Sequence, residues 1–155
     1  MEHEPGGTTR RKFLAAGGIG ALALGLPLRS EAQEVTDVEK ANAKVVSDFC
    51  AAWATRDVDK IGAFLAEDAV FRMMETAPRT EGREKIMQAL RMFLTNATSA
   101  EFIVHKSHVV GNIVLNQRTD IFKRGDRPEM SFNVAGVFFI KDGKIAEWYD
   151  FMMPE

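Results

Sequence analysis

Four apolar segments separated by turn residues make up the C-terminal half of the chain, and this pattern constrains the fold more than any other feature. The segments are rich in Val, Ile, Phe and Thr and cover residues 102–110, 113–123, 130–141 and 144–152. The dipeptide Asp142-Gly143 between two apolar runs favours a two-residue β-hairpin. We therefore expect four successive antiparallel strands that form a strongly curved meander.

The preceding segment predicts three helices and one short strand. Apolar residues recur at steps of three and four between residues 36 and 56, which is the spacing of an amphipathic helix. Similar spacing predicts helices over 58–65 and 82–95, and the short apolar run 69–74 predicts a strand. Helices followed by an antiparallel sheet indicate an α+β domain. We expect the sheet to wrap around the helices as a cone with an apolar pocket inside.

The first 32 residues have the pattern of a targeting segment. The pair Arg10-Arg11 precedes Phe13-Leu14 and an uncharged stretch that is rich in Ala, Gly and Leu. This order resembles a twin-arginine export signal, and the stretch is shorter than the roughly 20 apolar residues that a transmembrane helix needs. We expect residues 1–32 to be a signal peptide for the twin-arginine export machinery. Residues 33–155 would then form the mature domain, located in the periplasm or secreted.

Charge and cysteine content exclude several functions. The net charge is −2, and no run of Lys or Arg suggests contact with nucleic acid. The single cysteine, Cys50, excludes an intramolecular disulfide and a zinc site built from cysteines. We expect no cofactor and no metal. An enzyme acting on a small molecule, a small-molecule binder and an interaction module remain.

Two of the strand-like segments carry acidic residues that could converge. Arg118 and Asp120 are two residues apart in the segment 113–123, so their side chains share one face of a strand. If Arg118 lies opposite Ala135, its guanidinium can reach both Asp120 and Asp150. Two carboxylates held by one guanidinium can act as an acid–base pair. A register shifted by one residue would instead turn Arg118 and Asp120 outward as an exposed ion pair.

The hairpin predicts the neighbours of Asp150. Counting outward from the Asp142-Gly143 turn places Ala135 opposite Asp150 and Val137 opposite Trp148. These neighbours are small or apolar, and Trp148 shares a face with Asp150. We therefore expect Asp150 to lie in a pocket that Val137 and Trp148 help to form.

Four motifs resemble the limonene-1,2-epoxide hydrolase family, whose cone-shaped α+β fold is shared with ketosteroid isomerases and SnoaL-like polyketide cyclases. The motifs are Asn116-Gln117-Arg118-Thr119-Asp120, Gly136-Val137-Phe138, Asp142-Gly143-Lys144-Ile145 and Trp148-Tyr149-Asp150-Phe151. The resemblance implies a one-step hydrolysis. Asp150 would deprotonate a water, Asp120 would protonate the epoxide oxygen, and Arg118 would hold both acids.

The resemblance also identifies a departure from the family. The family holds its water with a tyrosine and an asparagine, and the matching positions here are Phe71 and Met73. We expect both residues in the pocket. Asn133, which the expected register places near Asp120, is a candidate to hold the water instead.

Three functions follow from these patterns. The leading hypothesis is a cofactor-independent hydrolase that opens a small lipophilic epoxide. The same aspartates could instead serve an isomerase or cyclase, as in the ketosteroid isomerases and polyketide cyclases. The third hypothesis is a non-catalytic module that binds a small ligand. In each case the partly apolar outer face of the sheet suggests a homodimer.

Overall fold

The helices of the described chain precede most of its strands. The computed structural model describes residues 34–154. The helices are α1 (Asp37–Ala52), the 3-10 helix η1 (Trp53–Thr55), α2 (Val58–Gly62) and α3 (Arg83–Leu94). The strands are β1 (Leu65–Arg72), β2 (Thr80–Glu81), β3 (Ser99–Val110), β4 (Ile113–Lys123), β5 (Met130–Lys141) and β6 (Lys144–Met152). The expected signal peptide over residues 1–32 lies outside the described residues, so both it and export stay predictions.

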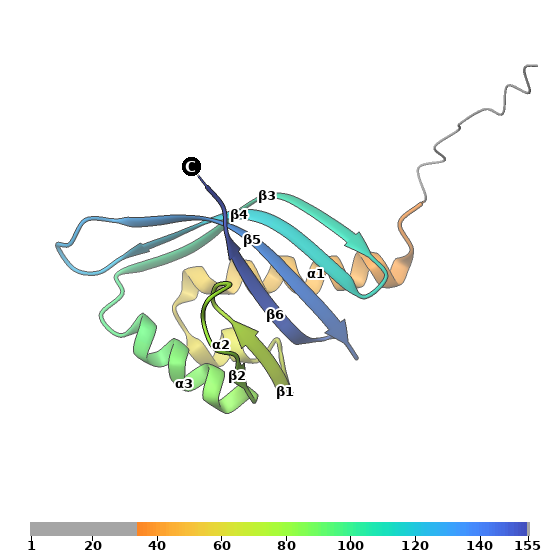
Figure 1. Ribbon diagram of the computed structural model, residues 1–155, viewed down its shortest axis with the longest axis horizontal. Helices are drawn as coiled ribbons and strands as arrows, with labels where there is room; N and C mark the ends of the chain where they lie inside the picture. Colours follow the sequence, from red (N-terminus) through yellow and green to blue (C-terminus); the bar gives the residue numbers. More distant parts are fainter. Residues whose placement is uncertain (1–33, 155) are drawn as a thin grey trace, which may run out of the picture. The chain divides into compact units, whose positions relative to one another are not determined.

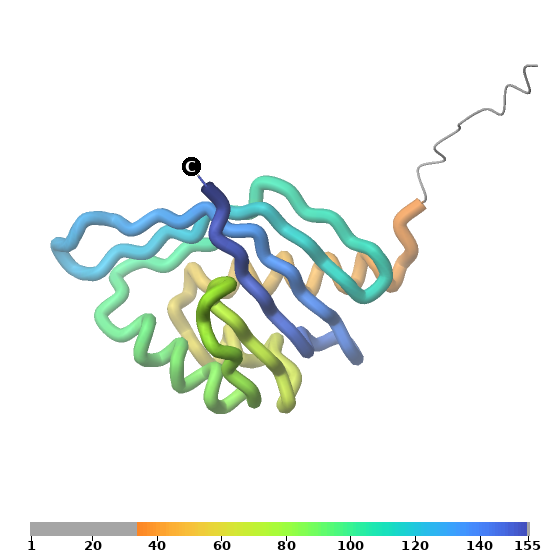
Figure 2. The backbone as a smooth tube through the Cα atoms, in the orientation of Figure 1, coloured from red at the N-terminus to blue at the C-terminus, as the bar shows by residue number. Residues whose placement is uncertain are grey.

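One mixed sheet contains all six of these strands, in the order β2-β1-β6-β5-β4-β3. Strand β1 is parallel to β6, and the other neighbours are antiparallel. Figure 1 shows the helices gathered on one face of the sheet, and Figure 2 shows β1 beside the C-terminal strand β6. The expected α+β fold with helices packed in a mixed sheet is confirmed. None of the helices in residues 34–154 is long and apolar enough to span a membrane.

The β5–β6 hairpin has the expected turn but a different register beyond it. Asp142 and Gly143 have φ values of 51° and 72°, as a two-residue turn of this type requires. An irregularity near Ala146 then shifts the pairing by one residue. As a result Asp150 lies opposite Gly136, not Ala135 as predicted, and Trp148 lies opposite Phe138, not Val137.

The β4–β5 register also differs from the prediction by one residue. Arg118 lies opposite Val134, and Ala135 pairs with Gln117. The connection between these strands covers residues 124–129, which is too long for a two-residue turn to fix the register. The inward face of β4 is the expected one, since Arg118 and Asp120 are buried, whereas that of β5 is the opposite one, since Val134 faces inward where Ala135 was expected.

The edge of the sheet near β1 differs from the prediction too. Strand β1 begins at Leu65, whereas the sequence pattern assigned Leu65 to a helix and began the strand at residue 69. Leu65 pairs with Ile145 of β6, and this tertiary contact outweighs the local helical spacing. The two-residue strand β2 was not predicted, and its Thr80 pairs with Phe71.

Hydrogen bonds attach the first turns of α1 to the β3–β4 turn. Thr36 and Glu39 form a capping box at the start of the helix. Glu39 Oε1 also accepts from the backbone N–H of Gly111 (2.8 Å), and Asn42 Nδ2 donates to the Gly111 carbonyl (2.9 Å). These contacts hold α1 against the sheet. They thereby position the aromatic residues at the C-terminal end of α1 over the sheet.

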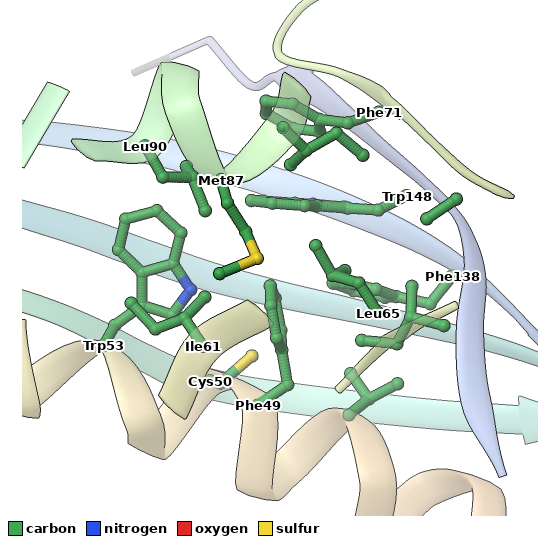
Figure 3. Close-up of a cluster of buried hydrophobic side chains, with 14 of the residues drawn as sticks. Phe49, Cys50, Trp53, Ile61, Leu65, Phe71, Met87, Leu90, Phe138 and Trp148 are labelled. Carbon is green, nitrogen blue, oxygen red and sulfur yellow. The ribbon is translucent and has the colours of Figure 1, made fainter. Parts of the chain in front are cut away.

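Aromatic side chains from the helices and the sheet form the core next to the pocket. Phe49 is fully buried and contacts Trp53, Phe138 and Trp148, with ring centroids 6.3, 5.9 and 5.0 Å away (Figure 3). Trp148 also stacks on Phe71 of β1 at 3.9 Å. This packing joins α1, β1, β5 and β6 and leaves little freedom for the residues that face the sheet's interior.

Candidate active site

Arg118 is the centre of a buried ionic cluster on the inward face of the sheet. Its side chain is 0% exposed. Its Nε donates to Asp120 Oδ1 at 2.7 Å and its Nη2 to Asp120 Oδ2 at 3.1 Å. The same Nη2 forms an ion pair with Asp150 Oδ2 at 2.8 Å. The structure therefore brings together Arg118, Asp120 and Asp150, the three residues singled out in the sequence, although their strands pair in a different register.

Gly136 makes the space for this arginine. It lies on β5 between β4 and β6, directly opposite both Asn116 and Asp150. A Cβ atom at Gly136 would come within 2.2 Å of Arg118 Nη1 and 2.6 Å of Asn116 Oδ1. The missing side chain thus allows the guanidinium to cross β5 toward Asp150.

Three further hydrogen bonds complete the cluster. Arg118 Nη1 donates to Asn116 Oδ1 at 3.1 Å, and Asn116 Nδ2 donates to Cys50 Sγ at 3.5 Å. Trp148 Nε1 donates to Asp150 Oδ1 at 2.8 Å. Sequence reasoning placed Asn116 on this face but gave no contact to it. The sequence signal that could have revealed this contact is Gly136, because a glycine in the middle of a strand often marks a close approach of another group.

Aromatic rings surround the guanidinium. Arg118 Cζ lies over the ring of Phe102 at 4.5 Å from its centroid and 5.9 Å from that of Phe138. Such cation–π contacts are stronger where water is excluded. Phe102 of β3 pairs with Asp120 of β4, and this register places the Phe102 ring beside the charged cluster.

Burial dominates the acid–base properties of the cluster. It raises the pKa of Asp120 to about 6, and it also raises the pKa of Asp150, although Arg118 acts in the opposite direction on both. Burial alone would lower the pKa of Arg118, but Asp150 and Asp120 raise it, so the guanidinium stays charged. The Arg118 guanidinium thus faces two carboxyl groups whose pKa values are both raised. Two coupled carboxyl groups of this kind can together retain one proton near neutral pH.

The two acids face a cavity of about 460 Å³. Its lining is mostly apolar and comes from η1, α3, the segment between β1 and β2, and all six strands of the sheet. Asp120, Asp150 and Thr80 are the polar lining residues other than the two tryptophans. The remaining lining residues are Phe71, Met73, Met74, Ala77, Pro78, Ala89, Leu90, Phe93, Phe102, Phe122, Phe132, Val134 and Met152.

Three of the five residues expected in the pocket lie there, and two do not. Phe71, Met73 and Trp148 line the cavity. Val137 and Asn133 are absent from its lining. They were misplaced because the actual register turns odd-numbered β5 residues outward, and exposed Asn133 accepts a hydrogen bond from Thr119 (3.2 Å) on that outer face. Asn133 therefore cannot hold a water beside Asp120.

The described residues do not gather into a metal site. No group of three or more His, Cys, Asp or Glu side chains in residues 34–154 could hold a metal ion. Cys50 is buried next to Asn116, and burial raises the pKa of its thiol to about 12. Cys50 is thus a neutral core residue, as its place on the apolar side of α1 predicts.

Comparison with known proteins places this fold and site in a family. Residues 46–148 match the model of the SnoaL-like domain. The chain belongs to the SnoaL-like domain family. The expected resemblance to epoxide hydrolases and their cyclase and isomerase relatives is therefore confirmed.

Individual relatives include epoxide hydrolases. Epoxide hydrolase EphG of Mycobacterium tuberculosis is 30% identical over 106 residues, which is 68% of this chain and 69% of that protein. The structure of an M. tuberculosis LEH-like epoxide hydrolase has a TM-score of 0.67 and 28% identity, covering 74% of this chain and 84% of that one. A Catenulispora acidiphila protein with a ketosteroid isomerase-like fold has a TM-score of 0.62 at 16% identity, over 69% and 83% of the two chains, and shares the fold.

Gly136→Ala tests whether the glycine makes room for Arg118. The new Cβ would overlap Arg118 Nη1, which the surrounding ion pairs hold in place, so we expect a loss of about 1–3 kcal/mol in the free energy of unfolding. Urea denaturation measures it. The control is Gly62→Ala, where the three atoms nearest to the new Cβ all belong to the unbranched side chain of Met87. Equal effects of the two changes would contradict the account.

Asp120→Asn tests the raised pKa of Asp120. Because this pKa is higher in the folded chain than in the unfolded one, the folded state holds the proton more tightly. The wild-type free energy of unfolding should therefore fall as pH rises from about 4 to above 6, and the difference between 3.8 and about 6 corresponds to about 3 kcal/mol. Asp120→Asn should remove the part of this decline that Asp120 contributes, while the raised pKa of Asp150 still contributes its own part.

Urea unfolding at several pH values between 4 and 7 measures the difference. The matched control is Asp126→Asn, which removes an exposed carboxylate. If wild type and Asp120→Asn show the same pH dependence of stability, burial does not govern the protonation of Asp120.

Proposed function

We propose that the protein is a cofactor-independent epoxide hydrolase that opens a small lipophilic epoxide to a diol. The observation that carries this proposal is the placement of Arg118 between two buried carboxylates at the wall of an apolar cavity. The similarity to two proteins described as epoxide hydrolases supports it. The mostly apolar lining favours a lipophilic substrate.

The proposed reaction uses the two acids in opposite protonation states. Ionised Asp150 takes a proton from a water molecule, and the water oxygen attacks one epoxide carbon. The bond from that carbon to the epoxide oxygen breaks as Asp120 gives its proton to the oxygen. The cycle closes when Asp150 releases its proton and Asp120 regains one.

The contacts of the two carboxylates support this division of roles. Asp150 accepts from two separate donors, the N–H of Trp148 and the guanidinium of Arg118, and both favour its ionised form. Asp120 has Arg118 as its donor, and burial keeps its pKa near 6. A carboxyl group with such a pKa can donate a proton near neutral pH.

An isomerase or cyclase that moves protons within its substrate is the second candidate. The specific observation in its favour is the part of the cavity wall formed by Phe71 of β1 and by Met73, which follows that strand. Phe71 stacks on Trp148, and Met73 is 48% exposed at the cavity. Neither side chain can hold a water by hydrogen bonds. A proton shuttle on a lipophilic ketone would use Asp120 and Asp150 without such a water.

Turnover of an epoxide panel tests the hydrolase proposal. We expect wild type to form diols and Asp120→Asn to lower kcat at least about 100-fold, because it removes the general acid. The double variant Phe71→Tyr/Met73→Asn should raise kcat, since it adds water-binding groups to that part of the cavity wall. Diol formation is measured by gas chromatography, with Asp126→Asn as the control that retains wild-type turnover.

The outcomes separate the candidates. Wild type that opens no epoxide, or Asp120→Asn with full turnover, contradicts the hydrolase. If the protein then exchanges an acidic C–H proton of a ketone with deuterated water, as followed by NMR, the isomerase or cyclase takes its place.

A further inference from the structure

The cavity wall carries one hydroxyl group that the proposed reaction does not use. Among residues 34–154, Thr80 of β2 is the only lining residue whose side chain is polar, uncharged and not an indole. The indole N–H of Trp148 donates to Asp150, and that of Trp53 is buried on the side of Met87, which does not line the cavity (Figure 3). A polar group of the substrate that the two aspartates do not bind therefore has Thr80 as its side-chain partner in the cavity.

The pairing of β1 with β2 directs the Thr80 side chain into the cavity. Thr80 lies directly opposite Phe71 in this antiparallel pair, and the side chains of opposite residues project from the same face of a sheet. Phe71 lines the cavity and stacks on Trp148, so this face is the inward one. The two-residue strand β2 thus brings a hydroxyl group to the cavity wall at the edge of the sheet.

The hydroxyl of Thr80 is open to a ligand. Thr80 is half-buried, so its side chain is not enclosed in the core as the indole of Trp53 is. The hydroxyls of Thr55 and Thr95 donate to backbone carbonyls at 2.6 and 2.7 Å, whereas that of Thr80 has no hydrogen-bond partner within the described residues. A hydroxyl can donate and accept at the same time, so it can pair with a hydroxyl group of a ligand in either direction.

Thr80 lies too far from Asp150 to bind the same substrate atom. Phe71 of β1 separates Thr80 from Trp148 of β6, and Asp150 is two residues further along β6. Two strand spacings of about 4.8 Å and two residues of about 3.3 Å each put the backbones of Thr80 and Asp150 about 12 Å apart. Phe71 and Trp148, stacked at 3.9 Å, form the apolar wall between them. One small molecule can therefore contact the aspartates at one end and Thr80 at the other.

We propose that the Thr80 hydroxyl binds a hydroxyl group of the substrate, so that the preferred substrate is a small epoxide that also carries an alcohol at the end remote from the epoxide. This inference rests on the proposed hydrolase function and narrows its substrate class. A site that hydrogen-bonds a polar group of its substrate discriminates against the analogue that lacks this group. Purely hydrocarbon epoxides of the same shape would therefore be the poorer substrates.

A pair of isosteric epoxides tests the inference. Both are 1-methylcyclohexene 1,2-epoxides, one with a 2-hydroxypropan-2-yl group at carbon 4 and the other with a tert-butyl group there, so a methyl replaces the hydroxyl. We expect wild type to favour the alcohol in kcat/KM. Thr80→Val keeps the branched shape of the side chain but lacks the hydroxyl, and should lower this ratio about fivefold to tenfold, as the loss of one hydrogen bond does.

Two further variants serve as controls. Thr80→Ser keeps the hydroxyl and should keep most of the preference for the alcohol, although it loses the methyl group. Thr119→Val makes the same change as Thr80→Val in another strand, where the hydroxyl bonds to Asn133 on the outer face, and should leave the ratio as in wild type. Because the readout is a ratio, a general loss of packing in any variant does not move it. A ratio that Thr80→Val leaves unchanged, or a wild type that prefers the tert-butyl compound, overturns the inference.

Binding separates failure of this inference from failure of the hydrolase proposal. If wild type opens neither epoxide, the hydrolase proposal fails. Titration with 2-(4-methylcyclohexyl)propan-2-ol and with 4-tert-butyl-1-methylcyclohexane, which lack the epoxide, then tests Thr80 alone, with tryptophan fluorescence as the signal. Tighter binding of the alcohol that Thr80→Val abolishes supports the role of Thr80, and equal affinities of wild type for the two compounds overturn it.

Discussion

The buried guanidinium of Arg118 is the interaction on which the rest of the site depends. A charge in an apolar interior is costly unless its hydrogen bonds and its counter-charges are in place. Asp120, Asp150 and Asn116 supply them from two different strands, and Phe102 lies under the cation. Strand β5 lies between β4 and β6, and Gly136 on β5 has no side chain in the way. The Arg118 side chain can therefore reach Asp150 as well as Asp120.

The same arrangement gives the pocket its chemistry. Because the cluster is dry and aromatic, burial outweighs the attraction of Arg118 and raises the pKa of both acids. An acid that retains its proton beside a carboxylate that has lost one is what a push–pull reaction needs. The cavity wall adds shape and little polarity, since Asp120, Asp150 and Thr80 are its polar residues other than the two tryptophans.

The sequence predicted the inward faces of β4 and β6 correctly but not that of β5, and it placed the β4–β5 and β5–β6 registers one residue off. The period of two placed Arg118 and Asp120 inward, and the Asp142-Gly143 turn was correct, since both signals are local. The irregularity near Ala146 and the long 124–129 connection carry no comparable local signal, so Val137 and Asn133 were assigned to the pocket although they lie outside it. The hydrogen bond from Asn116 to Cys50 and the stacking of Trp53 on Phe102 depend on packing between elements far apart in the sequence and could not be read from spacing.

Burial, and not the ion pair with Arg118, governs the protonation of the two carboxylates. Carboxyl ¹³C NMR titration of the protein labelled at its aspartates, with Asp120→Asn and Asp150→Asn to assign the signals, measures this most directly. We expect Asp120 to titrate near pH 6 and the pKa of Asp150 also to lie above 3.8. Two carboxylates that both titrate below 3.8 would show that the guanidinium prevails, and would contradict this expectation.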